Sequence, residues 1–327
     1  MLNRFLPLYF TVFISALSLT AIIEHHLIPM LRGKADQPIY DKGPNWHKAK
    51  GAIPTMGGLA FLIASTVSFF ICSIFFFITA NNTSALRILT FAFLCIGNAL
   101  IGLVDDLTKL KRKENTGLTP KQKLLLQGII AFAFLFMNSK LSASGYMFDL
   151  ILFKISSPFL YYPAGLFLIL GIINCANLTD GIDGLASSVA YAIGIIFFIK
   201  SAATNEICAL ISVILIGSSL AFLAFNINPA KIFMGDTGSL LLGAMAVSCA
   251  FAGETPISII SIGAIYVIEG VSVILQVIYY KLTKKRLFKM APLHHHLEKS
   301  GFSENKICLI AMIITFITSL FAFIIKQ

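Results

Sequence analysis

The segment Phe167–Ala186, FLILGIINCANLTDGIDGLA, begins as an apolar run and ends in a cluster of amide and carboxylate side chains. Asn177, Asp180 and Asp183 follow the run at intervals of three residues. Ionisable groups are costly in lipid and, where they occur there, usually serve a function. The segment therefore predicts a membrane helix that ends in a functional loop.

The composition extends this prediction to the whole chain. Hydrophobic residues make up 57% of the 327 residues and charged residues only 12%, whereas a soluble domain has about 25% charged residues. Apolar stretches of about 20 residues, the length of a membrane-spanning helix, recur along the sequence. Because lipid excludes open sheet edges and exposed loops, we expect an all-α, polytopic membrane protein that forms a single domain over residues 1–327.

The apolar stretches define ten candidate spans. They cover residues 5–28, 56–80, 86–104, 124–138, 158–176, 184–201, 207–225, 238–252, 257–280 and 306–326. The first follows Arg4 without a small-residue cleavage site, so we expect a transmembrane helix rather than a signal peptide. Residues 141–157 are amphipathic and are expected at the membrane interface. The six cysteines all fall in apolar segments without CxxC spacing, which predicts buried free thiols rather than disulfides or a metal site.

The connections between these spans alternate in charge. One set is short and nearly uncharged, and the other holds 19 of the 25 lysines and arginines. The positive-inside rule assigns the basic set to the cytoplasm, so ten spans would place both termini on the outer side. A net charge of +10 would favour nucleic-acid binding in a soluble protein. Here topology and attraction to anionic lipid account for the charge, and no nucleic-acid partner is expected.

The polar clusters of the chain lie in the basic set of connections. The first connection ends in KAKGAIPTMGG, Lys48–Gly58, which places Lys50 and Thr55 beside the start of a helix. Free N–H groups at a helix N-terminus favour anions. Close packing of two helices would explain the glycines of this stretch equally well.

The second connection contains GLVDDLTKL, in which Asp105 and Asp106 end an apolar helix and Lys109 follows. Carboxylates near a helix C-terminus oppose the macrodipole, and adjacent carboxylates repel each other. The pair therefore needs compensation, either from Lys109 or from a divalent cation. A solvated helix end with one salt bridge is the alternative. Lys121 and Lys123 begin the next helix, a position that again favours anions.

The third connection contains the amides and carboxylates of the opening segment. Asn174, Asn177, Asp180 and Asp183 stand three residues apart, so neighbours share a helix face while the first and last would point apart on an unbroken helix. The glycines of DGIDG allow a break that turns all four toward one pocket. The alternative is an N-cap on the next helix, which needs only one such residue.

The last two connections contain an aspartate and a histidine triplet. Asp236 in FMGDTGSL precedes an apolar run, where an N-cap is the alternative function. His294, His295 and His296 are consecutive, so a regular helix cannot direct all three at one ion. Zinc sites on a helix use separated ligands such as HxxxH. They suit hydrogen bonding to phosphate or substrate better.

The pattern of ligands favours one class of chemistry. Oxygen ligands without thiols select a hard cation, Mg²⁺ first. Lysines and helix N-termini around carboxylates are the parts of a phosphoryl-transfer site. A site at the cytosolic edge of the membrane suggests one lipid and one water-soluble substrate. Glu24 and Glu269 lie inside spans, where one contact with a neighbouring helix explains each, and we leave them outside the site.

Five stretches together resemble a known family. PTMGG, DDLTK, NLTDGIDGLA, FMGDTGSL and APLHHHLEKSG occur in this order over nearly the whole chain. They resemble the motifs of the polyprenyl-phosphate N-acetylhexosamine-1-phosphate transferase superfamily. The uninterrupted HHH triplet and PTMGG resemble its muramoyl-pentapeptide branch, whereas relatives that use UDP-N-acetylglucosamine carry an interrupted histidine motif.

The resemblance implies a reaction and a set of site residues. The reaction is transfer of phospho-N-acetylmuramoyl-pentapeptide from its UDP-activated form to undecaprenyl phosphate, giving lipid I and UMP with Mg²⁺, at the cytoplasmic face of a bacterial inner membrane. The implied catalytic residues are Asp105, Asp106, Asp236 and His294, with Asp105 and Asp236 as metal ligands. The implied substrate-binding residues are Lys50, Thr55, Lys109, Lys121, Asn174, Asn177, Asp180, Asp183, His295 and His296. One-step and two-step transfer both remain open, as does the oligomeric state, with a homodimer among the options.

Three other functions compete with this one. The nearest is a sister transferase that acts on UDP-N-acetylglucosamine. A secondary transporter would place substrate groups near the membrane midplane, often on broken helices. An intramembrane aspartic protease would need two aspartates inside spans. The candidate carboxylates cluster at the ends of spans instead, which counts against both transport and proteolysis.

Overall fold

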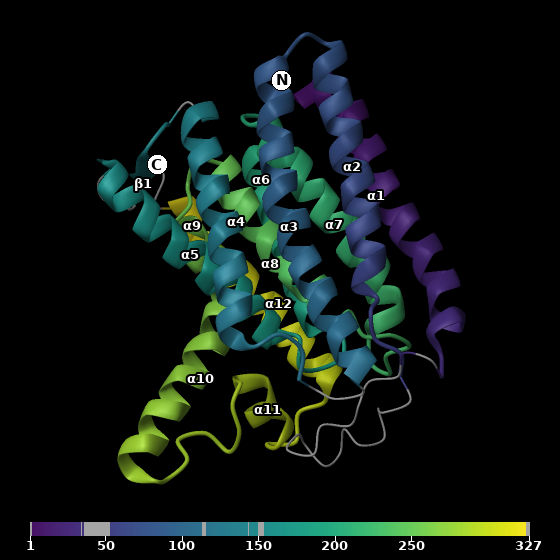
Figure 1. Cartoon of the computed structure of the whole chain (residues 1–327), viewed down its shortest axis with the longest axis vertical. Coiled ribbons are helices and arrows are strands. Elements are labelled where there is room, and N and C mark those ends of the chain that lie inside the picture. The colour runs from purple at the N-terminus through teal and green to yellow at the C-terminus, as the bar shows by residue number, and fades with distance from the viewer. Residues whose placement is uncertain are drawn as a thin grey trace.

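A computed structural model describes residues 2–33, 35, 53–112, 116–142, 144–149 and 154–324. Its helices are α1 (Leu2–Leu31), α2 (Gly58–Ile78), α3 (Asn82–Arg112), α4 (Pro120–Leu141), α5 (Pro158–Thr179), α6 (Leu185–Ser201), α7 (Glu206–Asn226), α8 (Gly235–Ala252), α9 (Ser258–Ile262), α10 (Ala264–Thr283), α11 (Leu293–Glu298) and α12 (Glu304–Ile324). In this part of the chain, nine helices are long and apolar enough to cross a membrane, and α6 is a shorter apolar helix. The chain is therefore a polytopic helical membrane protein, as its composition predicts (Figure 1).

Each predicted span has a helix in its place, with two differences in extent. The predicted span 257–280 is two helices, because the chain turns at Gly263 between α9 and α10. The predicted span 86–104 belongs to a helix of 31 residues, α3, which continues to Arg112. About 20 residues suffice to cross a bilayer, so the last turns of α3 are available to carry polar side chains.

A short β-hairpin interrupts the helical fold. Strand β1 (Met147–Asp149) pairs antiparallel with β2 (Lys154–Ser156), with Phe148 opposite Ile155. The amphipathic segment 141–157 thus contains a hairpin between α4 and α5. Figure 1 shows it at the end of the bundle opposite α11.

Helix α8 is the centre of the bundle. It contacts α2, α3, α5, α6 and α7, and its residues from Thr237 to Ala252 are all buried. The first turn of α8 packs directly against glycines of two neighbouring helices. A Cβ at Gly102 of α3 would collide with the Asp236 backbone, and one at Gly58 of α2 would collide with the backbone of Gly238. The glycines of the neighbouring helices therefore fix where Asp236 lies.

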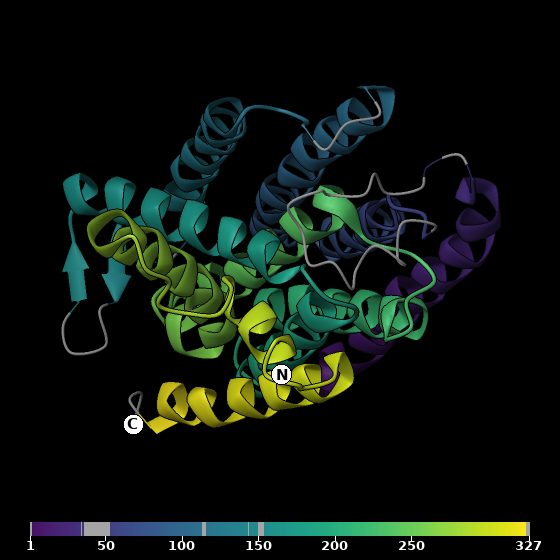
Figure 2. The same ribbon diagram turned by 90° about the horizontal axis from the view of Figure 1, so that it is seen from below.

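The polar connections meet at one end of the bundle. The end of α3 and the starts of α4 and α8 lie at the same end as α11 (Figure 1). Figure 2 views the molecule from this end, with α12 along one edge and α3 and α4 toward the opposite edge. The six cysteines are free thiols, and all of them except Cys175 are buried.

Candidate active site

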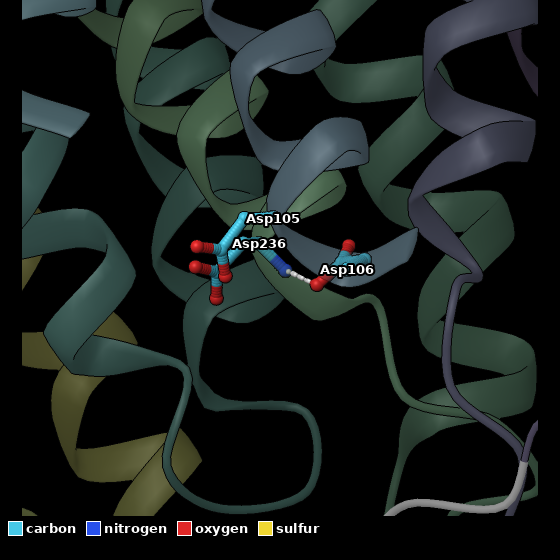
Figure 3. Close-up of side chains that lie close together, drawn as sticks. All are labelled: Asp105, Asp106 and Asp236. Atoms are coloured by element: carbon cyan, nitrogen blue, oxygen red, sulfur yellow. Dashed lines mark hydrogen bonds between the residues drawn. The ribbon is translucent and has the colours of Figure 1, made fainter. Parts of the chain in front are cut away.

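Three aspartates from two helices form the centre of the site. Asp105 and Asp106 lie in α3, and Asp236 lies in the first turn of α8. One oxygen from each carboxylate lies within 4.8 Å of the others (Figure 3). The prediction that Asp105 and Asp106 end their helix is wrong, because α3 continues for six residues beyond Asp106 to Arg112.

Asp106 caps the N-terminus of α8 from a different helix. Its Oδ1 accepts from the backbone N–H of Asp236 at 3.0 Å, the bond drawn in Figure 3. Its Oδ2 accepts from the backbone N–H and the hydroxyl of Thr237 at 2.9 and 2.7 Å. Gly235 has φ +67°, and a Cβ there would press on the Asp106 carboxylate. A carboxylate in this position stabilises a helix start, so Asp106 holds Asp236 in place.

Two lysines lie among the carboxylates. The Nζ atom of Lys109 is 2.6 Å from Oδ2 of Asp105 and 3.3 Å from Oδ2 of Asp236. The Nζ atom of Lys123 is 3.4 Å from Oδ1 of Asp105 and forms a very short contact with Oδ2 of Asp236. The backbone N–H of Leu118 also donates to Oδ1 of Asp105 at 2.7 Å. The lysines supply the compensation that adjacent buried carboxylates require.

At the start of α4, the lysine that contacts the aspartates is Lys123 and not the predicted Lys121. Lys121 is exposed, whereas Lys123 points into the aspartate cluster. The buried face of α4 contains Gln127 and Ala131, and Lys123 precedes Gln127 by four residues, so all three share one face. The polar Gln127 within an apolar helix was the signal that could have identified Lys123.

The helix is interrupted in the third connection, as predicted, but the four polar residues of this connection have different partners. Helix α5 ends at Thr179 and α6 begins at Leu185, with Gly184 at φ +78°. Asn177 points into the site, where its amide donates to Oδ1 of Asp236 at 3.1 Å and to Oγ of Ser239 at 2.8 Å. The carboxylates of Asp106 and Asp236 also act electrostatically on Asp180.

Asn174 and Asp183 have partners of their own outside the aspartate cluster. The Asn174 amide donates to Gln127 at 2.9 Å. Oδ2 of Asp183 accepts from the Asn228 amide at 2.9 Å and from the backbone N–H of Ala230 at 3.0 Å. The structure therefore does not join all four residues to the aspartate cluster by hydrogen bonds. Asp183 instead ties the α5–α6 loop to the α7–α8 loop.

The first connection reaches the site through the backbone. Thr55 lies in an extended segment before α2, and its N–H donates to the carbonyl of Ala35 at 2.9 Å. The neighbouring Pro54 carbonyl accepts from Phe233, and the Gly58 N–H donates to Met234, so this segment braces the loop that leads to Asp236. Lys50 lies outside the described residues.

The three histidines have different surroundings in and around α11. His294 is fully buried and pairs through Nδ1 with Glu269 of α10 at 3.2 Å. Nδ1 of His295 is 2.6 Å from Glu298. Nδ1 of His296 accepts from the backbone N–H of Lys289 at 3.1 Å. Glu269 was left out of the predicted site, although its place inside an apolar span was the signal that could have included it.

Comparisons with known proteins agree with this geometry. The pattern of Glycosyl transferase family 4 matches residues 88–254. The Phospho-N-acetylmuramoyl-pentapeptide-transferase of Clostridioides difficile (strain 630) is 39% identical over 306 residues, 92% of each chain. Its namesake from Staphylococcus epidermidis (strain ATCC 12228) is 41% identical over 318 residues, 94% of this chain and 96% of that one. The chain belongs to the phospho-N-acetylmuramoyl-pentapeptide-transferase family. It is therefore a phosphoglycosyl transferase of peptidoglycan synthesis.

The aspartate cluster of this phospho-N-acetylmuramoyl-pentapeptide-transferase family member suits a divalent cation. Its three close carboxylates offer only oxygen ligands, which hard cations such as Mg²⁺ prefer. Both oxygens of Asp106 already accept hydrogen bonds from the first turn of α8. The carboxylates of Asp105 and Asp236 instead face the two lysine ammonium groups, whose place an ion can take. These two carboxylates therefore fit an ion best, and Mg²⁺ commonly takes one or two carboxylates plus substrate phosphates.

Asp180 should make the stability of the protein depend on pH. Desolvation, together with the charges of Asp236 and Asp106, raises the pKa of Asp180 to about 8, against about 3.9 in an unfolded chain. The unfolded state therefore releases this proton first, and the fold loses stability as the pH rises from about 4 to about 8.

Asp180→Asn removes this titration and should stabilise the protein relative to wild type. In EDTA, the difference in thermal midpoint should grow from pH 5 to pH 8 and stay constant above it. A difference that does not change over this range would contradict the assignment.

Proposed function

We propose that this chain transfers phospho-N-acetylmuramoyl-pentapeptide from its UDP-activated form to undecaprenyl phosphate, giving lipid I and UMP. The observation that carries the proposal is the convergence of Asp105, Asp106 and Asp236 with two lysines at one end of an apolar helical bundle. This arrangement supports phosphoryl transfer, which depends on positioning and charge neutralisation. The family to which the chain belongs supports the choice of substrates.

The metal of the proposed reaction is Mg²⁺, which Asp105 and Asp236 would hold. When bound, it would neutralise charge on the diphosphate of the nucleotide sugar. Lys109 and Lys123 already contact both carboxylates. Their ammonium groups can turn to the substrate phosphates, where they offset the negative charge that develops during transfer.

The bond changes define what each residue must do. An oxygen of the lipid phosphate forms a bond to the phosphorus next to the sugar, and the bond from that phosphorus to the bridging oxygen breaks. UMP leaves with the electron pair. Asp105 orients or deprotonates the lipid phosphate, and Asn177 and Asp106 hold Asp236 in position. A two-step route would form the same product through an enzyme-phosphate.

The proposed orientation follows from the charge distribution. The chain would lie in a bacterial inner membrane with the aspartate cluster at the cytoplasmic face, because the connections that carry these aspartates belong to the set that holds 19 of the 25 lysines and arginines of the sequence. Both substrates would meet there, since the nucleotide sugar is water-soluble and the acceptor is a lipid. A homodimer remains a prediction from the sequence.

The test is UMP release by the purified protein with polyprenyl phosphate as the acceptor. With UDP-N-acetylmuramoyl-pentapeptide and Mg²⁺, we expect multiple turnovers and a lipid-linked product. EDTA should abolish release, and restored Mg²⁺ should return it. UDP-N-acetylglucosamine is the control donor and should give less than about 1% of the rate, since a site that hydrogen-bonds a substrate group rejects analogues without it. Faster turnover with that donor would favour the sister transferase.

A further inference from the structure

Glu269 and His294 form a buried pair beside the α5–α6 loop. Glu269 lies in α10, and His294 lies in the six-residue helix α11. The backbone N–H of His294 donates to both Glu269 oxygens, at 3.1 and 3.3 Å. The ring atom Nδ1 lies 3.2 Å from Oε2 of the same carboxylate. One carboxylate therefore fixes both the backbone and the ring of His294.

The other ring nitrogen of His294 has no hydrogen-bond partner among the described residues. Its Nε2 is nevertheless fully buried. A Cβ at Gly181 would collide with this atom, so Nε2 faces the α5–α6 loop next to Asp180. Buried polar atoms are rarely left unpaired. An unpaired ring nitrogen against the loop that carries Asp180 indicates a place for a substrate group.

The chemistry of the carboxylate sets the tautomer of the ring. An ionised carboxylate only accepts hydrogen bonds, so Nδ1 of His294 must carry the proton that faces Glu269. In the neutral imidazole, which has a single ring proton, Nε2 then keeps its lone pair. His295 differs, since its carboxylate partner Glu298 belongs to the same short helix, whereas the carboxylate partner of His294 lies in α10.

We propose that Glu269 is a positioning residue that holds His294 as the Nδ1–H tautomer, so that Nε2 accepts a hydrogen bond from a substrate O–H or N–H. The proposal rests on the proposed transferase function and names a further residue of that site. The donor group belongs either to the nucleotide sugar or to a protonated lipid phosphate, and separate KM values for the two substrates identify which.

Glu269→Gln should reverse the tautomer. Glutamine offers one acceptor and one donor in place of two acceptors. The carbonyl oxygen will accept from the His294 backbone N–H, and the NH₂ group will then donate to Nδ1. The ring proton moves to Nε2, which loses the lone pair offered to substrate.

The primary readout is the ¹⁵N NMR spectrum of protein labelled at histidine, with His294→Asn assigning the signal. Wild type should show a protonated Nδ1 and an unprotonated Nε2 at His294, and Glu269→Gln should show the reverse. The kcat/KM of Glu269→Gln should fall about 10- to 100-fold, since a substrate donor would then face a donor. Glu24→Gln is the matched control, because it makes the same change at another buried carboxylate within a span, and it should leave the tautomer unchanged.

Gly181→Ala provides a second variant that leaves Glu269 intact. The added Cβ displaces the ring from the loop, so kcat/KM should fall while the tautomer stays as in wild type. The proposal is overturned by an unchanged tautomer in Glu269→Gln, or by wild-type kinetics in Gly181→Ala. The tautomer is measured in resting protein, so failure of wild type to release UMP would count against the proposed function and not against this pairing.

Discussion

Asp236→Asn is expected to reduce UMP release by at least about a thousandfold while the protein remains folded. Asparagine has nearly the same shape, and the backbone N–H of residue 236 can still donate to Asp106. The substitution removes a proposed metal ligand and the charge that Lys109 and Lys123 share. The measurement is the rate at saturating Mg²⁺ and substrates, together with the thermal midpoint.

The control for Asp236→Asn is a carboxylate at the other end of the bundle. Glu254 lies 3.7 Å from Arg87 and is partly exposed, so Glu254→Gln should change the rate by less than about twofold. If Asp236→Asn kept more than about a tenth of wild-type turnover at normal stability, Asp236 could not have the electrostatic role assigned to it.

Lys123→Gln is expected to lower kcat about a hundredfold, whereas Lys121→Gln should cost less than about threefold. The two lysines stand two residues apart on the same helix, but only Lys123 contacts Asp105 and Asp236. Lys121 is exposed. Both variants remove one positive charge from the same turn, so the comparison separates position from net charge.

The kinetic comparison should be made at two ionic strengths. If the lysines raised kcat only through the general positive field of the basic loops, salt would screen the effect of both substitutions. The loss of kcat in Lys123→Gln should instead persist at high salt, because Lys123 acts within the buried cluster. Equal losses in Lys121→Gln and Lys123→Gln would contradict the geometry of the cluster.

The sequence predicted the helices well because hydrophobicity determines them. Every predicted span has a helix in its place. The errors arose where hydrophobicity does not mark the end of a helix. Residues 257–280 are apolar on both sides of Gly263, so nothing in their composition marks the turn there. Asp105 and Asp106 end an apolar run, but their charge is neutralised by tertiary partners, and α3 continues past them.

The site was harder to predict because its contacts join distant parts of the chain. The residue types that bind Mg²⁺ and phosphate can be found within each loop. The sequence alone could not show that Asp106 caps a helix that starts 129 residues later, at Gly235. It also could not show that Asp183 binds Asn228 instead of facing the cluster. Such partners depend on how the helices pack, which no local pattern records.

Helix periodicity could have resolved one of the remaining errors. Lys123, Gln127 and Ala131 share a face of α4, and the last two are buried, which favours Lys123 over Lys121 once the buried face is known. For Glu269, the cost of a carboxylate within a span was known from the sequence. Its partner, His294, could not be identified because α10 and α11 are joined by a connection without regular structure.

The most direct test is anomalous diffraction from crystals of the protein grown with Mn²⁺ and the nucleotide-sugar donor. Mn²⁺ suits the same oxygen ligands as Mg²⁺ and identifies itself by its anomalous signal. We predict a single strong peak between the carboxylates of Asp105 and Asp236, absent in Asp236→Asn crystals. A peak at another position, or one that persists in the variant, would contradict the claim that these aspartates share the catalytic cation.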